Sequence, residues 1–137
     1  MARERSCGAV IFSDNDYLLL RYGWGHWGFM KGNVETGEDE LETILREAEE
    51  ETRLTANQLS FIEGFRETIT YFYKNEGRTI YKKVIFLLAE SNSRDVTLSH
   101  EHNDYAWLDY NEALKRLTYD NAREILQKAE QHRQNNL

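Results

Sequence analysis

Residues 32–54, GNVETGEDELETILREAEEETRL, decide the fold of this chain, because they predict a helix with one apolar and one acidic side. Apolar residues recur there at positions i, i+3, i+4 and i+7: Leu41, Ile44, Leu45 and Ala48. This spacing is typical of a helix that packs against a core. We expect the helix to begin at Thr36 or Gly37 and to end near Thr52.

The acidic side carries Glu47, Glu50 and Glu51 at positions i, i+3 and i+4. With ~100° between residues, these carboxylates begin at the edge of the apolar stripe and run away from it. Three carboxylates gathered there cannot all stay charged cheaply without a cation between them. Hard divalent cations such as Mg²⁺ prefer oxygen ligands and commonly act on phosphates. A solvated acidic face is the commoner role of such a run, so the surrounding residues must decide.

The composition fits one domain over residues 1–137, with 40% hydrophobic and 12% aromatic residues to fill a core. A formal charge of −7 makes a nucleic-acid partner unexpected, although a metal ion and local cations can still attract a small anionic substrate. Cys7 is the only cysteine, which excludes an internal disulfide and fits a cytoplasmic location. We expect no membrane span, because no apolar run approaches the ~20 residues required, and no secretory signal.

Outside residues 32–54, the pattern predicts both strands and helices. Strands are expected over residues 6–12, 17–22, 59–73, 79–90 and 104–108. The first two should be antiparallel, and a turn near 74–77 should join the next long pair into a hairpin. Helices are expected over residues 111–117 and 121–132, each with an Asn near its N-cap. The predicted fold class is α/β, a mixed β-sheet sandwiched between helices.

The stretch over residues 32–54 resembles the Nudix box, G-x5-E-x7-R-E-U-x-E-E-x-G-U, in which U is a bulky apolar residue. The matching residues are Gly32, Glu38, Arg46, Glu47, Glu50, Glu51 and Leu54. Ala48 is small for the first U position, and Arg53 replaces the last Gly. A Gly there normally supplies the left-handed conformation that ends a helix. Arg53 should therefore be strained by about 1 kcal/mol, or the helix should end differently.

The resemblance continues across nearly the whole chain and is greatest to the asymmetrical diadenosine tetraphosphate hydrolases. The segments that carry it are His26-Trp27, Lys31-Gly32, Ile62-Glu63-Gly64-Phe65, Leu98-Ser99-His100-Glu101-His102 and Tyr105-x-Trp107-Leu108. Phe29-Met30 depart from it, because the family usually has Pro there. The resemblance implies a Nudix fold and metal-dependent hydrolysis of a phosphoanhydride bond, with diadenosine tetraphosphate cut to ATP and AMP.

The same resemblance implies roles for the acidic residues. The metal ligands for Mg²⁺ or Mn²⁺ would be Glu47, Glu50, Glu51, Glu101 and the Gly32 carbonyl. The catalytic residues would be Glu47, Glu50 and Glu101. Glu47 is the first choice for orienting or deprotonating the attacking water, but the identity of the base stays open. The pair His100 and His102 could instead suggest zinc, although a complete zinc site needs further nitrogen or sulfur ligands.

Glu38 and Arg46 lie eight residues apart, on roughly one side of the helix, and we expect a structural ion pair between them.

The expected substrate contacts are His26, Lys31, Tyr71, Lys82 and Tyr119. Tyr71 and Tyr119 match the family's adenine-clamping positions, and each stack would contribute ~1–3 kcal/mol. The lysines, together with Arg78, are the candidate phosphate-facing cations. Strand alternation leaves open which way Lys82 and Arg78 point. His26 could equally be a packing residue, and on the sequence alone core or cross-strand packing is the favoured role of Tyr71.

Two other functions remain open on the sequence alone. One is a Nudix pyrophosphohydrolase that acts on RNA 5′ ends, nucleoside triphosphates or nucleotide sugars, although an RNA-end enzyme should have a more basic surface. The other is a Nudix module that binds nucleotides without cutting them, which would have no need to keep every box carboxylate. The number of metal ions and the oligomeric state have no signature in the sequence.

Overall fold

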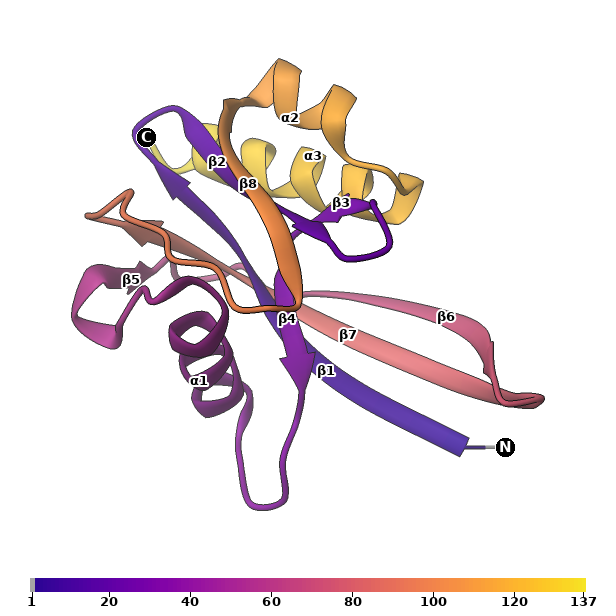
Figure 1. Cartoon of the computed structure of the whole chain (residues 1–137). Helices are drawn as coiled ribbons and strands as arrows, with labels where there is room; N and C mark the ends of the chain where they lie inside the picture. The colour runs from indigo at the N-terminus through magenta and orange to yellow at the C-terminus, as the bar shows by residue number, and fades with distance from the viewer. Residues whose placement is uncertain (1) are drawn as a thin grey trace.

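The computed structural model describes residues 2–137, which form a mixed β-sheet with helices on both faces (Figure 1). The central strand is β1 (Ala2–Ser13), which pairs in parallel with β7 (Arg78–Ser91) along nearly its whole length. The other edge of β1 pairs antiparallel with β2 (Asp16–Tyr22) and β4 (Met30–Asn33). The predicted fold class and the first antiparallel pair are therefore confirmed.

Four further strands complete the sheet. They are β3 (Trp27–Gly28), β5 (Leu59–Phe61), β6 (Glu67–Asn75) and β8 (His102–Asp109). β3 and β8 pair with β2, whereas β5 and β6 pair with successive parts of β7. The prediction of one strand over residues 59–73 is wrong, because the chain turns at Gly64, whose φ is +88°. β4 was not predicted.

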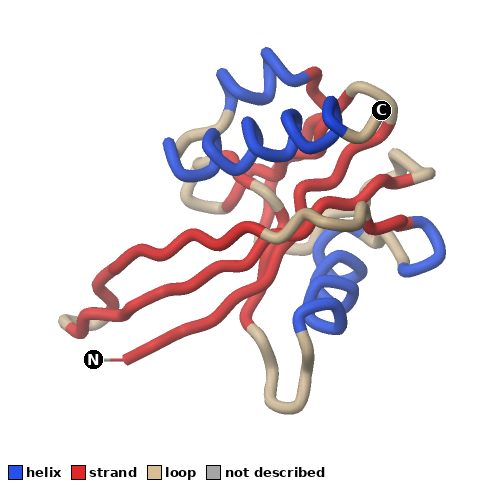
Figure 2. The backbone as a smooth tube through the Cα atoms, turned by 180° about the vertical axis from the view of Figure 1, so that it is seen from behind, coloured by secondary structure: helices blue, strands red, loops and turns tan. Residues whose placement is uncertain are grey.

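The sheet separates two hydrophobic clusters. Alternate residues of β1 point to opposite faces, as a strand requires. Cys7, Ala9 and Ile11 pack on the face covered by α1 (Glu40–Thr52). Val10 and Phe12 pack on the other face, under α2 (Tyr110–Arg116) and α3 (Asp120–Asn135). Figure 2 shows the two groups of helices on opposite sides of the strands.

Three helix predictions need correction. α1 begins at Glu40, because Asp39 caps it and forms a reciprocal capping box with Glu42. Leu41 lies in the first turn and is 42% exposed, so the buried stripe begins at Ile44. Neither closing helix has an Asn N-cap. Asp109 caps α2, and α3 follows Tyr119 without a side-chain cap.

The hairpin of β6 and β7, together with the first residues of β1, extends beyond the helices as a three-stranded arm (Figure 1). Glu76 and Gly77 at its tip have φ values of +52° and +76°, as a type I′ turn requires, so the predicted hairpin is confirmed. A short 3₁₀ helix (Ala56–Gln58) links α1 to β5. Across residues 2–137, no helix is both long and apolar enough to cross a membrane.

Candidate active site

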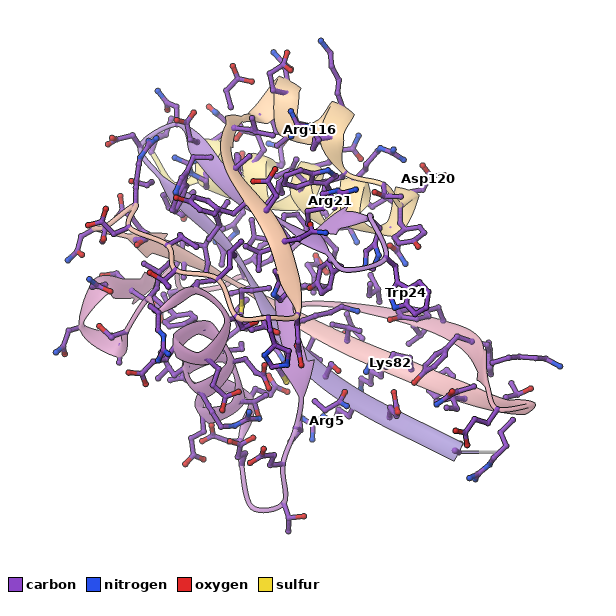
Figure 3. All side chains as sticks on the ribbon, in the orientation of Figure 1. Arg5, Arg21, Trp24, Lys82, Arg116 and Asp120 are labelled. Atoms are coloured by element: carbon purple, nitrogen blue, oxygen red, sulfur yellow. The ribbon has the colours of Figure 1, made fainter. Side chains whose placement is uncertain are left out.

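Two cavities lie side by side and share part of their walls. The acidic cavity, of about 710 Å³, is lined by Gly32, Glu47, Glu50, Glu51, Ser99 and Glu101, among others. The aromatic cavity, of about 760 Å³, is lined by Trp24, His26, Trp27, Tyr71, Tyr73 and Tyr119, among others. Tyr22, Lys31 and Lys82 line both cavities and form what we call the shared wall. Figure 3 shows Lys82 within the three-stranded arm and Trp24 on the loop above it.

Arg46 organises the outer side of α1. Its Nε and Nη2 donate to the two carboxylate oxygens of Glu38 at 2.6 and 3.0 Å. Nη2 also donates to the Asn33 carbonyl at 3.0 Å, and Nη1 donates to Glu47 Oε1 at 2.7 Å. The guanidinium lowers the pKa of Glu38 to about 2. Arg46 therefore fixes the helix to the end of β4 and holds Glu47 in place.

Gly32 is the one residue of β4 that lets α1 approach so closely. It pairs with Cys7 across the β1–β4 ladder, and the Glu47 carboxylate lies directly against its Cα. A Cβ at this position would overlap that carboxylate. Glycine is therefore required here by the position of Glu47, whatever the backbone conformation.

Glu51 is a buried carboxylate with incomplete hydrogen bonding. Its side chain is 4% exposed, and Oε2 has no partner among the described residues. Burial, followed by the charges of Glu47 and Glu101, raises the pKa of Glu51 to about 9. Such a group is neutral at physiological pH unless a cation approaches it.

Exposure of the three carboxylates rises in the order that the helical wheel predicts. Glu51 is buried, the Glu47 side chain is 13% exposed and the Glu50 side chain is 59% exposed. Burial also raises the pKa of Glu47, although its contact with Arg46 opposes that shift. The two inner carboxylates therefore carry the unfavourable electrostatics, whereas Glu50 is exposed and contacts Arg46 Nη1 at 3.4 Å.

Arg53 has φ +66° and ψ +11°, so it takes the left-handed conformation that a glycine would supply. Just before it, the C-terminal end of α1 receives the loop that carries Glu101. Thr97 N–H donates to the Thr52 carbonyl, and Ser99 N–H donates to the Glu51 carbonyl. The Glu101 carbonyl accepts from Gly23 N–H at 3.2 Å. These bonds bring Glu101 to the acidic cavity, opposite the helix.

The donor set of this cavity fits a hard divalent cation, because it consists of carboxylates and a backbone carbonyl. The unpartnered Oε2 of buried Glu51 is an oxygen that such an ion would satisfy. Among the described residues, no three His, Cys, Asp or Glu side chains are already close enough to hold a metal. A cation would therefore have to draw in the exposed Glu50 and Glu101 and share Glu47 with Arg46.

The two histidines beside Glu101 face different surroundings. His102 is buried, and its ring packs edge-on against Tyr22 at 4.4 Å, with Nε2 unpartnered within residues 2–137. His100 is exposed and lines the acidic cavity. The alternative of a zinc site therefore finds no gathered nitrogen ligands in this part of the chain.

Of the three candidate phosphate-facing cations, two lie at the cavities and one lies away from them. Lys31 Nζ donates to the Tyr71 hydroxyl at 3.2 Å, and burial lowers the pKa of Lys31. Lys82 is 8% exposed and also belongs to the shared wall. Arg78 lies at the tip of the arm and lines neither cavity, so the structure places it away from the other two.

The aromatic side chains gather around His26. Its ring stacks on Tyr22 at 4.5 Å with an interplanar angle of 5°, and lies 5.5 Å from the ring of Tyr119. Burial, followed by the charge of Lys31, lowers the pKa of His26. Tyr119 is 55% exposed and free to stack, whereas Tyr71 is half-buried and packs against the core.

Sequence reasoning missed several residues that the structure brings to these cavities. Tyr22 forms part of the shared wall, and Trp24 is 94% exposed at the aromatic cavity. Glu4 and Asn33 bind the Lys82 ammonium. A tryptophan between two glycines is a detectable loop signal, but nothing in the order of residues indicates that Glu4 meets Lys82.

Comparison with known proteins agrees with this geometry. The family model described as NUDIX domain matches residues 2–129. The chain is 39% identical over 141 residues to the rat bis(5′-nucleosyl)-tetraphosphatase [asymmetrical], covering 93% of each chain. The Caenorhabditis elegans protein of the same name is 38% identical over 131 residues, covering 90% of this chain and 92% of that one. A crystal structure described as a C. elegans Ap4A hydrolase binary complex superposes with a TM-score of 0.80 at 35% identity, covering 91% and 93%.

Proposed function

This chain belongs to the Nudix family, and we propose that it hydrolyses diadenosine tetraphosphate asymmetrically, to ATP and AMP. One observation carries the proposal. The acidic cavity and the aromatic cavity share a wall that contains two lysines, Lys31 and Lys82. A polyphosphate with a nucleoside at its end needs an aromatic site for the base, then cations for the phosphates, then carboxylates that can hold a metal ion. The aromatic cavity, the shared wall and the acidic cavity supply these in that order.

Nudix hydrolases generally use divalent metal ions, and we propose Mg²⁺ or Mn²⁺ for this chain. Its ligands would be Glu47, Glu50, Glu51, Glu101 and the Gly32 carbonyl. When bound, the ion supplies positive charge against the phosphates and makes a nearby water easier to deprotonate. The buried, unpartnered oxygen of Glu51 and the oxygen-only donor set support this assignment.

Glu47 is the proposed base. Burial brings its pKa above that of a free glutamate, which makes it a better proton acceptor near neutral pH. Arg46 holds one of its oxygens at 2.7 Å, so the proton would go to the other, Oε2. Glu50 and Glu101 are the remaining catalytic candidates, because both line the same cavity and are exposed enough to reach a water.

The position of the nucleoside explains why the cut would fall off centre. We propose that Tyr119 and Tyr71 hold one adenine in the aromatic cavity. The phosphates would then pass His26, Lys31 and Lys82 before they reach the carboxylates. Water would attack a phosphorus in the acidic cavity, and the bond between the third and fourth phosphates, counted from the held nucleoside, would break. The held part would then leave as ATP and the other part as AMP.

We also propose one domain and a cytoplasmic location. The family match over residues 2–129 supports one domain across residues 1–137. Cys7 is buried and free, which suits a reducing compartment such as the cytoplasm. The formal charge of −7 supports a small nucleotide partner in preference to nucleic acid.

Product analysis tests the proposed reaction. The purified protein is incubated with Mg²⁺ and diadenosine tetraphosphate in ¹⁸O-labelled water, beside 5′-triphosphate RNA, nucleoside triphosphates and a nucleotide sugar. We expect preferred cleavage to ATP and AMP, with the label in only one product. Preference for another substrate would overturn the substrate assignment, and tight binding without cleavage would establish a non-catalytic module.

A further inference from the structure

Lys82 carries a buried ammonium group whose hydrogen bonds are largely committed. Its Nζ donates to Asn33 Oδ1 at 2.7 Å and to Glu4 Oε1 at 3.2 Å. Ser6 Oγ donates to the same Asn33 oxygen at 2.7 Å and so holds that amide in place. Because an ammonium group has three N–H donors, one remains for a ligand.

Glu4 is held as firmly as Lys82. The Tyr73 hydroxyl donates to Glu4 Oε1 at 2.5 Å, and Glu4 lies directly opposite Lys82 in the parallel ladder of β1 and β7. The bond from Tyr73, followed by that from Lys82, lowers the pKa of Glu4, and Lys31 acts in the same direction. A fixed, ionised carboxylate therefore lies against Lys82 of the shared wall.

This carboxylate changes what Lys82 offers to a phosphate. A phosphate bonded to Nζ would lie within a few ångströms of Glu4, since Nζ is only 3.2 Å from its oxygen. The repulsion grows with the charge of the phosphate. A terminal phosphate carries about −1.5 to −2 charges near neutral pH, whereas a bridging phosphate carries a single charge.

We propose that Glu4 is a specificity residue that excludes mononucleotides from the site by repelling a doubly charged terminal phosphate at Lys82. The inference rests on the proposed function, because it takes a phosphate to face Lys82. With the base in the aromatic cavity, the short chain of AMP ends near the shared wall, whereas a dinucleoside polyphosphate places only bridging phosphates there. Since AMP is also a product of the proposed reaction, the same carboxylate limits product inhibition.

The test is equilibrium binding by titration calorimetry, at mildly alkaline pH and without substrate turnover. The ligands are AMP and adenosine 5′-methylphosphate, whose phosphate carries one charge. The proteins are wild type, Glu4→Gln, Glu4→Ala and a control, Glu67→Gln. Glu67 lies on β6 and its side chain is 34% exposed, against 32% for Glu4. Neither residue lines a cavity, but Glu67 lies 3.8 Å from Lys128, whereas Glu4 is bonded to Lys82 of the shared wall.

We expect both Glu4 variants to bind AMP about 3- to 10-fold tighter than wild type. The methyl ester should gain about half as much on a logarithmic scale, because it carries half the charge. Glu67→Gln should change neither affinity. Unchanged or weaker AMP binding by both Glu4 variants would overturn the proposal, as would equal gains for the two ligands. Weaker binding of both ligands would instead show that Glu4 only positions Lys82.

This experiment separates the two proposals, because binding is measured independently of hydrolysis. Normal cleavage of diadenosine tetraphosphate together with unchanged AMP binding would remove the role of Glu4 and leave the reaction standing. Absence of cleavage by wild type would remove the reaction. If AMP failed to bind to any variant while diadenosine tetraphosphate bound to wild type, exclusion by Glu4 would also be wrong.

Discussion

The acidic cavity and the aromatic cavity solve different physical problems. The acidic cavity concentrates charge on one helix, and it leaves Glu51 with a pKa near 9 and an unpartnered oxygen. The aromatic cavity collects rings from the β2–β3 loop, β6 and the start of α3, and Tyr119 remains 55% exposed there. The first is electrostatically strained without a cation, whereas the second is simply open. Substitutions in the acidic cavity should therefore change turnover and stability, whereas substitutions in the aromatic cavity should mainly change KM.

The largest effect is expected for Glu51→Gln. The change is nearly isosteric, so the fold should be kept, but the cation would lose a buried ligand and turnover should fall by orders of magnitude, on the order of 10³-fold. Steady-state kinetics at saturating Mg²⁺ checks this. Glu67→Gln is the matched control, because Glu67 lines neither cavity. Wild-type turnover by Glu51→Gln would show that the metal assignment is wrong.

Gly32→Ala should follow, with a loss of turnover of about 10²-fold. The new Cβ would collide with the Glu47 carboxylate, which is the flexible end of a side chain and can move aside. The fold should therefore survive while the proposed base is displaced. Gly28→Ala provides the control, since a Cβ there makes only an ordinary 3.6 Å contact with Tyr22. Equal turnover in the two variants would contradict the role given to Glu47.

Stability should depend on pH through Glu51. Its folded pKa of about 9 lies above that of an unfolded glutamate, so the folded state binds more protons between those values. The free energy of unfolding of the metal-free protein should therefore fall as pH rises from about 5 to 8, by at most about 4 kcal/mol. Denaturant unfolding at several pH values measures this.

The slope should be smaller in Glu51→Gln, which ought to be more stable than wild type at the upper pH. A stabilised but inactive variant would be the signature of a carboxylate kept for function. If wild type and Glu51→Gln had the same pH dependence, Glu51 would not be the source of the strain.

The residues of the acidic cavity could be predicted from the sequence more fully than those of the aromatic cavity. The carboxylates of α1 follow from a periodic pattern, because residues three and four apart must share one side of a helix. The predicted start of that helix was wrong, because Asp39 caps the helix and the spacing of apolar residues does not reveal this cap. The prediction that Leu41 belongs to the buried stripe was wrong, because this residue lies in the first turn of α1 and is 42% exposed.

The aromatic cavity depends on contacts between residues distant in the chain. Tyr22 at the end of β2 stacks on His26 in the loop that follows, but Tyr119 reaches His26 from the N-cap of α3, some ninety positions later. Likewise, Glu4 meets Lys82 only because β1 and β7 pair in parallel with one particular register. Periodicity within a segment carries no information on such pairing, and only the family resemblance indicated Tyr71 and Tyr119.

The smallest effects are expected in the aromatic cavity, where Tyr119→Ala should raise KM about 5- to 150-fold through loss of one stack of ~1–3 kcal/mol. Because Tyr119 is exposed, kcat and the melting temperature should change little.

Tyr71→Ala should also raise KM, but with a loss of stability, since the ring packs against the core and its hydroxyl accepts from Lys31. Tyr71→Phe separates these roles by keeping the ring and removing the hydroxyl. Steady-state kinetics and thermal unfolding of the three variants would distinguish a stacking role from a packing role. An unchanged KM for both alanine variants would eliminate the adenine clamp and leave the acidic cavity as the whole of the site.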